Sequence, residues 1–192
     1  MKDLFSEIRG AVVSTLVLAV VCCGLYPLVV WGIAQVAFHD KANGSLIVEK
    51  DGTVRGSKLL GQNFTAEKYF HPRPSAAGNG YDAANSGGSN LAQSNKVLVT
   101  RIQGDIDKLA ARNPGQPVPI DLVTTSASGL DPDITPDAAY YQATRVATAR
   151  KLNEENVRKL IEQHTTARQL GLLGEARVNV LELNLALDKL AQ

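Results

Sequence analysis

The chain has 192 residues, of which 44% are hydrophobic and 20% charged, and its formal net charge is +1. This balance argues against intrinsic disorder, and the lack of a basic excess argues against nucleic-acid binding. Both cysteines, Cys22 and Cys23, lie in one apolar stretch near the amino terminus, so the rest of the chain has no disulfide, thiol nucleophile or cysteine-type metal site.

We interpret this apolar stretch, residues 11–38, as a retained transmembrane helix. It contains no Asp, Glu, Lys, Arg or His, and at about 1.5 Å of rise per residue it is long enough to cross a hydrocarbon core of about 30 Å. The alternative is a cleaved signal peptide, whose apolar region usually covers only about 7–15 residues. We therefore divide the chain into a short amino-terminal tail (1–10), the span (11–38) and an extramembrane domain (39–192).

One narrow face of the span is predicted to contact another helix. Small residues allow two helices to approach closely in lipid, and an amide seeks a hydrogen bond there. Glycine and serine are also tolerated in spans without such a role, and Pro27 can rotate one half of the helix against the other. At about 100° per residue, the predicted face contains Gly10, Ser14, Gly24, Gly32 and Gln35.

The orientation of the span follows only weakly from its flanks. Lys2 and Arg9 precede it and Lys41 and Lys50 follow it, so the positive-inside rule is nearly balanced. Long domains translocate largely regardless of charge. We predict a cytoplasmic amino terminus and an extracytoplasmic domain.

After the span, the sequence predicts a β-hairpin and then a long irregular segment. Apolar runs at 45–49 and 54–60 flank Asp51-Gly52, a hairpin signal in which both central residues take positive φ. Residues 61–95 are rich in Gly, Asn, Ser, Ala and Pro but keep aromatic anchors. We predict an ordered irregular surface that meets a partner or ligand.

The remaining sequence predicts helices and strands that alternate. Helical periodicity starts at Lys96, and helix starts are indicated by a Thr-Pro-Asp cap at 135–137 and by Asn153. The fold class expected is a single amino-terminal transmembrane helix plus one small mixed α/β (α+β) domain. The predicted elements are helices from 96 to a stop at 113–115, from 135 to about 152 and from 154 to about 164, and strands at 119–125 and 177–183.

Tests for nucleotide and metal motifs give no enzyme signature. Gly78-x-Gly80-x-x-Ala83 lacks the strand and helix of a dinucleotide loop, and no P-loop sequence is present. Acidic residues at 131–137 alternate like a calcium loop, but Pro136 replaces its required Gly, so we favour a helix start. No histidine has a ligand partner at metal spacing, and only His71 lies in the irregular segment. The serines of SASG (126–129) lie in no nucleophile elbow.

Five blocks of this sequence are specific when they are taken together. They are YFHPRPSAAG (69–78), SGGSN (86–90), VTTSASGLDP (123–132), ITPDAAYYQATRVATAR (134–150) and RVNVLELNLALD (177–188). With these blocks the sequence resembles the KdpC family, the C subunit of the Kdp-type potassium-transporting ATPase. The resemblance covers nearly the whole chain; a departure is LAQSN at 91–95, where such proteins more often read LGPTN.

The resemblance implies a non-catalytic accessory subunit of a bacterial inner-membrane complex that takes up potassium at the expense of ATP. Its implied partners are a potassium-channel-like subunit, a P-type ATPase subunit and membrane lipid. The family is needed for assembly and activity and is described as a catalytic chaperone that raises the ATP affinity of the pump subunit. No tightly bound cofactor is expected. If ATP binds, the candidate backbone N–H groups are those of a Gly-Ser turn, Ser86, Gly87, Gly88, Ser89 and Asn90.

Two hypotheses of different class follow. The first is the transporter subunit, which binds its partners through the face of the span and through the loops around HPRP and SASG. The second is an independent membrane-tethered extracytoplasmic sensor that uses the same loops for a small ligand. The candidate loop residues are His71, Arg73, Ser126, Ser128 and Asp131.

Overall fold

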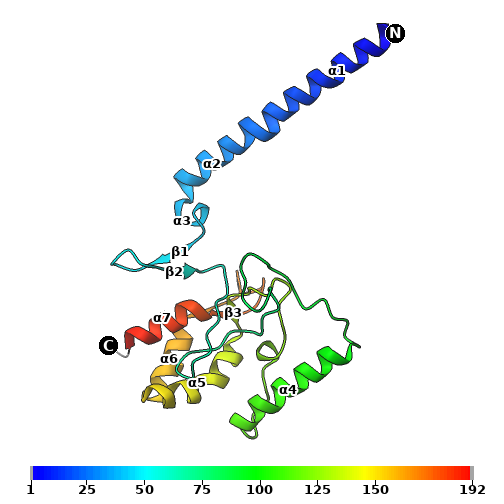
Figure 1. Cartoon of the computed structure of the whole chain (residues 1–192). Coiled ribbons are helices and arrows are strands. Elements are labelled where there is room, and N and C mark those ends of the chain that lie inside the picture. The colour runs from blue at the N-terminus through cyan, green and yellow to red at the C-terminus, as the bar shows by residue number, and fades with distance from the viewer. Residues whose placement is uncertain (1, 191–192) are drawn as a thin grey trace. The chain divides into compact units, whose positions relative to one another are not determined.

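A computed structural model describes residues 2–190 of the chain, which divides into two compact units, Met1–Arg55 and Gly56–Gln192. The first unit carries the long amino-terminal helix, and the second carries most of the remaining elements (Figure 1). The helices and strand pairs together confirm the predicted mixed α/β class with one apolar amino-terminal helix.

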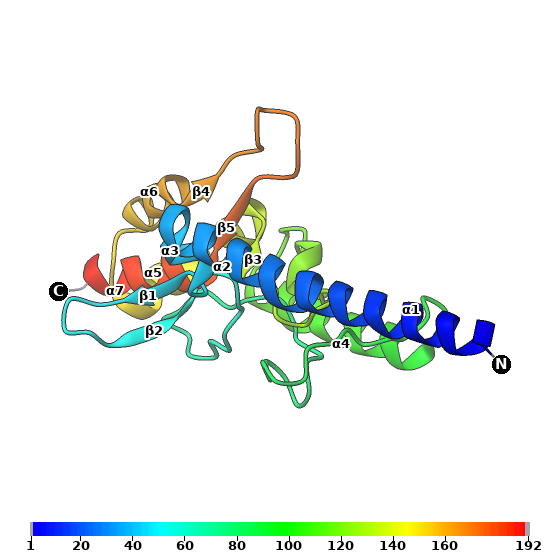
Figure 2. The same cartoon turned by 90° about the horizontal axis from the view of Figure 1, so that it is seen from above.

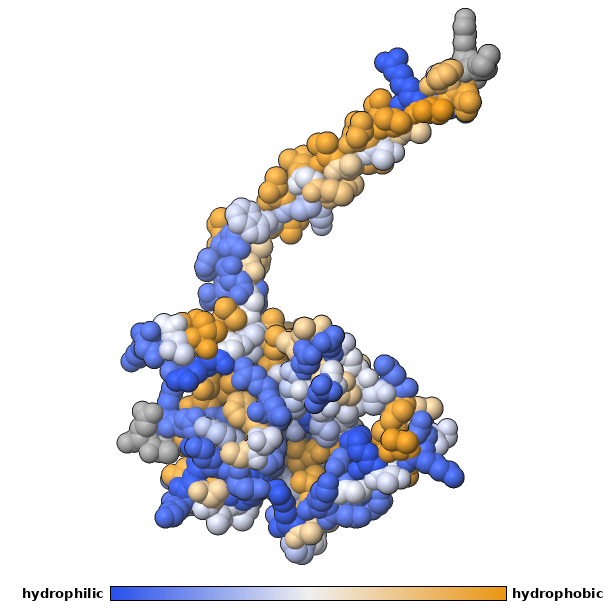
Figure 3. All heavy atoms as spheres, in the orientation of Figure 1, coloured by the Kyte–Doolittle hydropathy of each residue, from blue (hydrophilic) through white to orange (hydrophobic). Residues whose placement is uncertain are grey.

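The amino-terminal helix is continuous, with charged residues only in its first turns and an apolar sequence after Arg9. It consists of α1 (Lys2–Ala19), a π-helical turn η1 (Val20–Leu25) and α2 (Tyr26–Ala37), and it starts within the segment predicted as a tail. Leu4–Ala37 is long and apolar enough to cross a membrane, and its most apolar window has no buried residues. Figure 3 shows the hydrophobic side chains that cover this helix.

The π turn ends at Leu25, two residues before Pro27. In a regular α-helix the proline ring clashes with the carbonyl four residues earlier, and the wider turn relieves this clash. Because a π turn holds about one extra residue, the half that follows is rotated by about 100° relative to a uniform wheel. The predicted face therefore does not run as one straight stripe, since Gly10 and Ser14 are out of phase with Gly32 and Gln35.

The predicted hairpin is present, but its turn differs from the prediction. A short helix, α3 (His39–Ala42), precedes it, and β1 (Leu46–Val48) pairs with β2 (Val54–Ser57). Of the two residues Asp51 and Gly52, only Gly52 takes positive φ, at 83°. The Asp51 carboxylate instead accepts a hydrogen bond from the Thr53 N–H at 2.9 Å. The expectation of two positive φ values was wrong because the loop has three residues, 50–52. The Gly52 N–H donates to the Glu49 carbonyl and the Glu49 N–H donates to the Thr53 carbonyl, both at 2.9 Å, and in such a loop only the last residue takes positive φ.

As far as residue 190, the last one described, the second unit contains five helical elements and two strand pairs in one small sheet. The sheet order is β3-β5-β4, all antiparallel, and Val178 lies opposite both Ile134 and Thr165. These elements are α4 (Lys96–Arg112), the 3-10 turn η2 (Ile120–Leu122), β3 (Asp133–Ile134), α5 (Pro136–Arg150), α6 (Glu154–Gln163), β4 (Thr165–Thr166), β5 (Arg177–Asn179) and α7 (Val180–Leu190).

Helices α5, α6 and α7 lie together around the core, whereas α4 lies apart from them (Figures 1 and 2). The predicted caps are confirmed, since the side chain of Thr135 accepts the Ala138 N–H in the first turn of α5 and that of Asn153 accepts the Glu155 N–H in the first turn of α6. The largest fully buried side chains are Phe70, Ile161, Leu183, Leu187, Val146, Val157, Val178 and Asn184.

Two strand predictions need correction. Residues 119–125 form no strand but the turn η2, because the buried carboxylate of Asp121 accepts the Thr135 N–H at 2.6 Å and holds the segment against the start of α5. The strand predicted at 177–183 ends at Asn179. There the Asn179 side chain accepts the Glu182 N–H at 3.1 Å, and α7 begins.

The connection from β4 to β5 contains an ordered turn at residues 169–173, in which three leucine side chains are exposed to solvent. Gln169 and Leu173 exchange two backbone hydrogen bonds of 2.9 Å. Leu170, Leu172 and Leu173 are 90%, 82% and 60% exposed. Figure 2 shows this turn standing out from the sheet.

Candidate functional site

Residues 58–95 contain no helix or strand, yet their backbone is anchored to the helices. Phe70 donates its N–H to Asn184 Oδ1 at 2.8 Å, and its carbonyl accepts from Asn184 Nδ2 at 3.0 Å. His71 makes the same pair of bonds with the Gln142 side chain, at 2.8 and 3.1 Å. Two buried amides therefore take the place of a neighbouring strand, and the prediction of an ordered irregular segment is confirmed.

Two arginines of α5 bind the carbonyls just before Phe70. Arg145 donates to the carbonyls of Glu67 and Tyr69, and Arg150 donates to that of Lys68 at 2.7 Å. Arg150 also lies over the Tyr69 ring, 4.9 Å from its centroid, and pairs with Asp188 at 2.6 Å. Because three consecutive carbonyls are bound, the segment has a fixed path across α5.

The predicted partner-binding residues lie on two loops that the structure brings together. Arg73 pairs with Asp131 at 2.8 Å. Ser75 Oγ donates to the carbonyl of Gly129 at 2.6 Å, and a Cβ added at Gly129 would lie 2.6 Å from the Ala77 nitrogen. The HPRP and SASG loops thus form one packed surface. This contact leaves no room for a side chain at position 129.

Ser126 and Ser128 stabilise their own turn. Their hydroxyls accept the N–H groups of Gly129 and Leu130 at 3.0 and 3.1 Å. These bonds agree with the interpretation of SASG as a turn, and they leave partner binding by the two serines as a prediction.

The candidate nucleotide turn, residues 86–90, packs on the same SASG loop. Ser86 Oγ and the Gly87 N–H both donate to the carbonyl of Ser128, at 3.0 and 2.8 Å. A Cβ added at Gly88 would lie 3.1 Å from the Ala127 carbonyl oxygen. The Gly87 N–H is therefore directed at protein in this structure, and phosphate binding by this turn stays a prediction.

Two of the acidic residues at 131–137 pair with different arginines, in agreement with the helix-start interpretation. Asp131 pairs with Arg73, Asp133 pairs with Arg177 at 3.0 Å, and Thr135 caps α5. Within residues 2–190, no group of three or more His, Cys, Asp or Glu side chains is placed to hold a metal ion.

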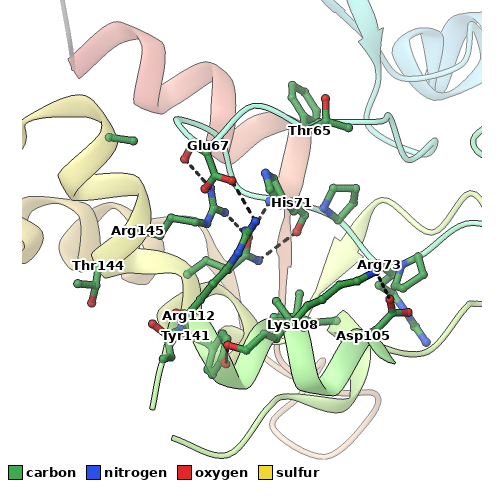
Figure 4. Close-up of a pocket in the computed structure, with 18 of the residues that line it drawn as sticks. Thr65, Glu67, His71, Arg73, Asp105, Lys108, Arg112, Tyr141, Thr144 and Arg145 are labelled. Carbon is green, nitrogen blue, oxygen red and sulfur yellow. Dashed lines mark hydrogen bonds and ion pairs between the residues drawn. The ribbon is translucent and has the colours of Figure 1, made fainter. Parts of the chain in front are cut away.

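A cavity of about 1140 Å³ lies between α4, α5 and residues 63–74 (Figure 4). His71 and Arg73, both predicted as functional, line it. Burial lowers the pKa of the His71 imidazole, and the nearby Arg145 guanidinium lowers it further, so the ring is neutral at pH 7. Burial also lowers the pKa of Arg145. His71 Nε2 lies 3.2 Å from the carbonyl of Ala66.

Sequence reasoning missed the helical residues of this cavity. Asp105, Lys108 and Arg112 line it from α4, and Arg145 lines it from α5. The spacing of 105, 108 and 112 places these three charges on one face of a helix. That spacing was a usable signal, but it resembled an ordinary solvated face.

The family described as the K+-transporting ATPase, c chain (KdpC) matches residues 8–189. A relative from Acidobacterium capsulatum, named potassium-transporting ATPase KdpC subunit, is 58% identical over 96% of this chain and 99% of its own length. Relatives with the same name from Koribacter versatilis and Rhodopseudomonas palustris are 52% and 54% identical, over 97% and 96% of this chain and 94% and 98% of their own.

Proposed function

Because the chain belongs to the KdpC family, as its motifs predicted, we propose that it is a non-catalytic accessory subunit of an ATP-driven potassium-uptake complex. The observation that carries this proposal is the family match over residues 8–189, which includes both the apolar helix and the domain. The relatives are named as subunits of a potassium-transporting ATPase, and this chain spans nearly their full length.

The amino-terminal helix is proposed as the membrane anchor and as one docking element. Its apolar side chains are exposed along Leu4–Ala37. A Cβ added at Gly10, Gly24 or Gly32 would meet nothing within 4 Å. Among the described residues, no neighbouring atom requires glycine at these positions, which supports close approach by a helix of another subunit. We propose the channel-like subunit and the P-type ATPase subunit as partners, with lipid around the rest of the helix.

The domain is proposed to lie outside the cytoplasm, with the amino terminus inside and the helix in the inner membrane. In this orientation the domain cannot reach cytoplasmic ATP. Any effect on the ATP affinity of the pump subunit must then pass through the partner subunits. Direct contact between residues 86–90 and ATP requires the opposite orientation.

Co-purification tests the subunit role. The full chain is tagged, expressed with the other subunits of its complex and extracted in mild detergent. The wild-type chain should recover a P-type ATPase subunit. Gly32→Leu should lower that recovery several-fold, whereas Val30→Leu, a change in the same helix α2, should not. Recovery of the tagged chain as a lone monomer would contradict the proposal and favour the sensor hypothesis.

Protease accessibility tests the orientation. In intact right-side-out vesicles the domain should be digested by added protease. Complete protection until the vesicles are opened would reverse the proposed orientation and permit direct contact with ATP.

A further inference from the structure

The lining of the cavity between α4, α5 and residues 63–74 combines charged and apolar side chains. Lys108 and Arg112 extend over it from α4, while Glu67 and Arg145 approach from the opposite side (Figure 4). The apolar part of the lining includes Phe64, Pro72, Leu109 and Leu122. A cavity of about 1140 Å³ is large enough for a small organic molecule.

The cations around this cavity outnumber the carboxylates. Glu67 is shared by Arg112 and Arg145, at 3.2 and 3.6 Å. One carboxylate cannot neutralise two guanidinium groups, so this cluster keeps a surplus positive charge.

The second carboxylate is shared in the same way. Asp105 lies 3.0 Å from Arg101 and 4.0 Å from Lys108. Nη2 of Arg101 is buried and has no hydrogen-bond partner among the described residues. Acceptors are therefore scarce beside Asp105, and this cluster also keeps a surplus positive charge.

Other titratable groups of the cavity do not cancel this surplus. Arg73 is paired with Asp131, and His71 is neutral at pH 7 because its pKa is lowered. The cavity wall thus has three cations that are not paired elsewhere, Lys108, Arg112 and Arg145, for the two carboxylates of Glu67 and Asp105. Asp105 is also shared with Arg101, which lies outside the wall.

One cation of the cavity is held in place by hydrogen bonds, whereas two others are exposed and free to reorient toward a bound anion. Arg145 is 16% exposed and is held by the Tyr69 carbonyl and by Gln142 Oε1, so it is fixed. Lys108 is 80% exposed and Arg112 is 50% exposed, so both can turn toward an incoming anion. Such side chains bind phosphate or carboxylate groups strongly when desolvated.

We propose that this cavity binds a small organic dianion. Its phosphate, or its pair of carboxylates, lies against Lys108 and Arg112, and its apolar body lies on Phe64 and Leu109. The site is separate from the candidate nucleotide turn at 86–90, and it does not depend on the subunit role proposed above.

Titration calorimetry on the full chain in detergent tests this proposal with phenyl phosphate as the probe. Inorganic phosphate supplies the charge without the apolar body, and phenol supplies the ring without the charge. Phenyl phosphate should bind about tenfold or more tightly than either, since the site uses both parts. Lys108→Gln and Arg112→Gln should each weaken its binding about fivefold or more, whereas Lys159→Gln, an exposed change on α6, should leave it unchanged.

A variant that is expected to raise the affinity for phenyl phosphate gives a further test. Glu67→Gln removes the internal competitor for Arg112 and Arg145, so phenyl phosphate should bind several-fold more tightly. The control Glu162→Gln, an exposed change on α6, should have no effect. Circular dichroism checks that each variant is folded.

Three results would overturn the proposal: no saturable binding of phenyl phosphate, equal binding of inorganic phosphate, or binding that Lys108→Gln and Arg112→Gln leave intact. If phenyl phosphate does not bind but the same two variants fail to co-purify with partner subunits, the surplus charge serves an acidic segment of a partner protein instead. Co-purification of the wild-type chain is measured separately, so failure of this proposal and failure of the subunit role are distinguishable.

Discussion

Helix α4 has regular secondary structure but no buried residues, whereas residues 69–71 have no regular structure but include a fully buried side chain. Helix α4 is a regular helix of 17 residues, none of which is buried. Residues 69–71 have no regular structure, yet they include Phe70, whose side chain has no exposed surface. In this domain, regular backbone geometry is therefore a poor guide to how firmly a segment is attached.

The difference follows from where each segment finds its hydrogen bonds. An α-helix satisfies most of its backbone groups internally, so α4 can lie over a cavity with few attachments. Its carboxyl-terminal end is held by Tyr141, whose hydroxyl donates to the Leu109 carbonyl at 2.7 Å. An irregular segment must find partners elsewhere when it is buried, and residues 69–71 find them on α5 and α7.

The largest effect is expected from Phe70→Ala. This change removes a fully buried aromatic side chain from the core and should lower the free energy of unfolding by about 3–5 kcal/mol. Urea denaturation of the full chain in detergent measures it. Phe64→Ala, at a partly buried position, should cost clearly less. Equal losses would mean that the irregular segment is no better anchored at Phe70 than at its edge.

Asn184→Ala removes the side-chain amide that makes two hydrogen bonds to the backbone of Phe70. It leaves the buried N–H and carbonyl of Phe70 without partners, so we expect a loss of about 2–4 kcal/mol in the free energy of unfolding. Asn156→Ala, on the exposed face of α6, serves as the control and should change stability by less than about 0.5 kcal/mol. If Asn184→Ala does not change the free energy of unfolding, water must replace the two hydrogen bonds of the Asn184 amide.

The same Ile→Ala change on α4 and on the buried face of α6 compares how much each helix contributes to the free energy of unfolding. Ile102→Ala on α4 should cost about 1 kcal/mol or less, because the side chain is only partly buried, whereas Ile161→Ala on α6 should cost about 2–5 kcal/mol. Hydrogen exchange should be faster for the amides of α4 than for those of α5. Comparable costs for both changes would place α4 within the core.

The smallest effect is expected from the titration of His71. Its pKa is lowered by burial and by Arg145, so the unfolded chain binds a proton more readily than the folded chain. The stability that this provides is complete above the ordinary histidine pKa of about 6.5 and is lost as the pH falls through the window below it. Unfolding measured between pH 7 and pH 5 should show this loss, and His71→Gln should reduce it. An unchanged pH dependence in that variant would assign the effect to other groups.

Local signals in the sequence predicted most of the helices correctly. The Thr135 and Asn153 caps and the apolar period of α4 depend on neighbours within a few residues. Strands β3 and β4 contain two residues each, too few for any alternation to be visible. The strand predicted at 119–125 failed because burial of Asp121 against α5 overrode the local preference.

The candidate site was predicted only in part for a similar reason. Unusual loop composition indicated His71, and the structure places Arg73 and Asp131, both in the predicted loops, in one ion pair. Gln142 and Asn184 bind residues that lie 71 and 114 positions away in the sequence. No local pattern distinguishes a buried amide of this kind from an exposed one on a helix.

The π turn before Pro27 has a consequence for how the length of the amino-terminal helix can change. A deletion of one residue between Val20 and Leu25 would return this turn to an α-helix and restore the clash at Pro27. Replacement of Pro27 alone would remove the need for the wide turn. The two changes therefore compensate each other, and the helix is expected to accept a one-codon deletion here only together with loss of the proline.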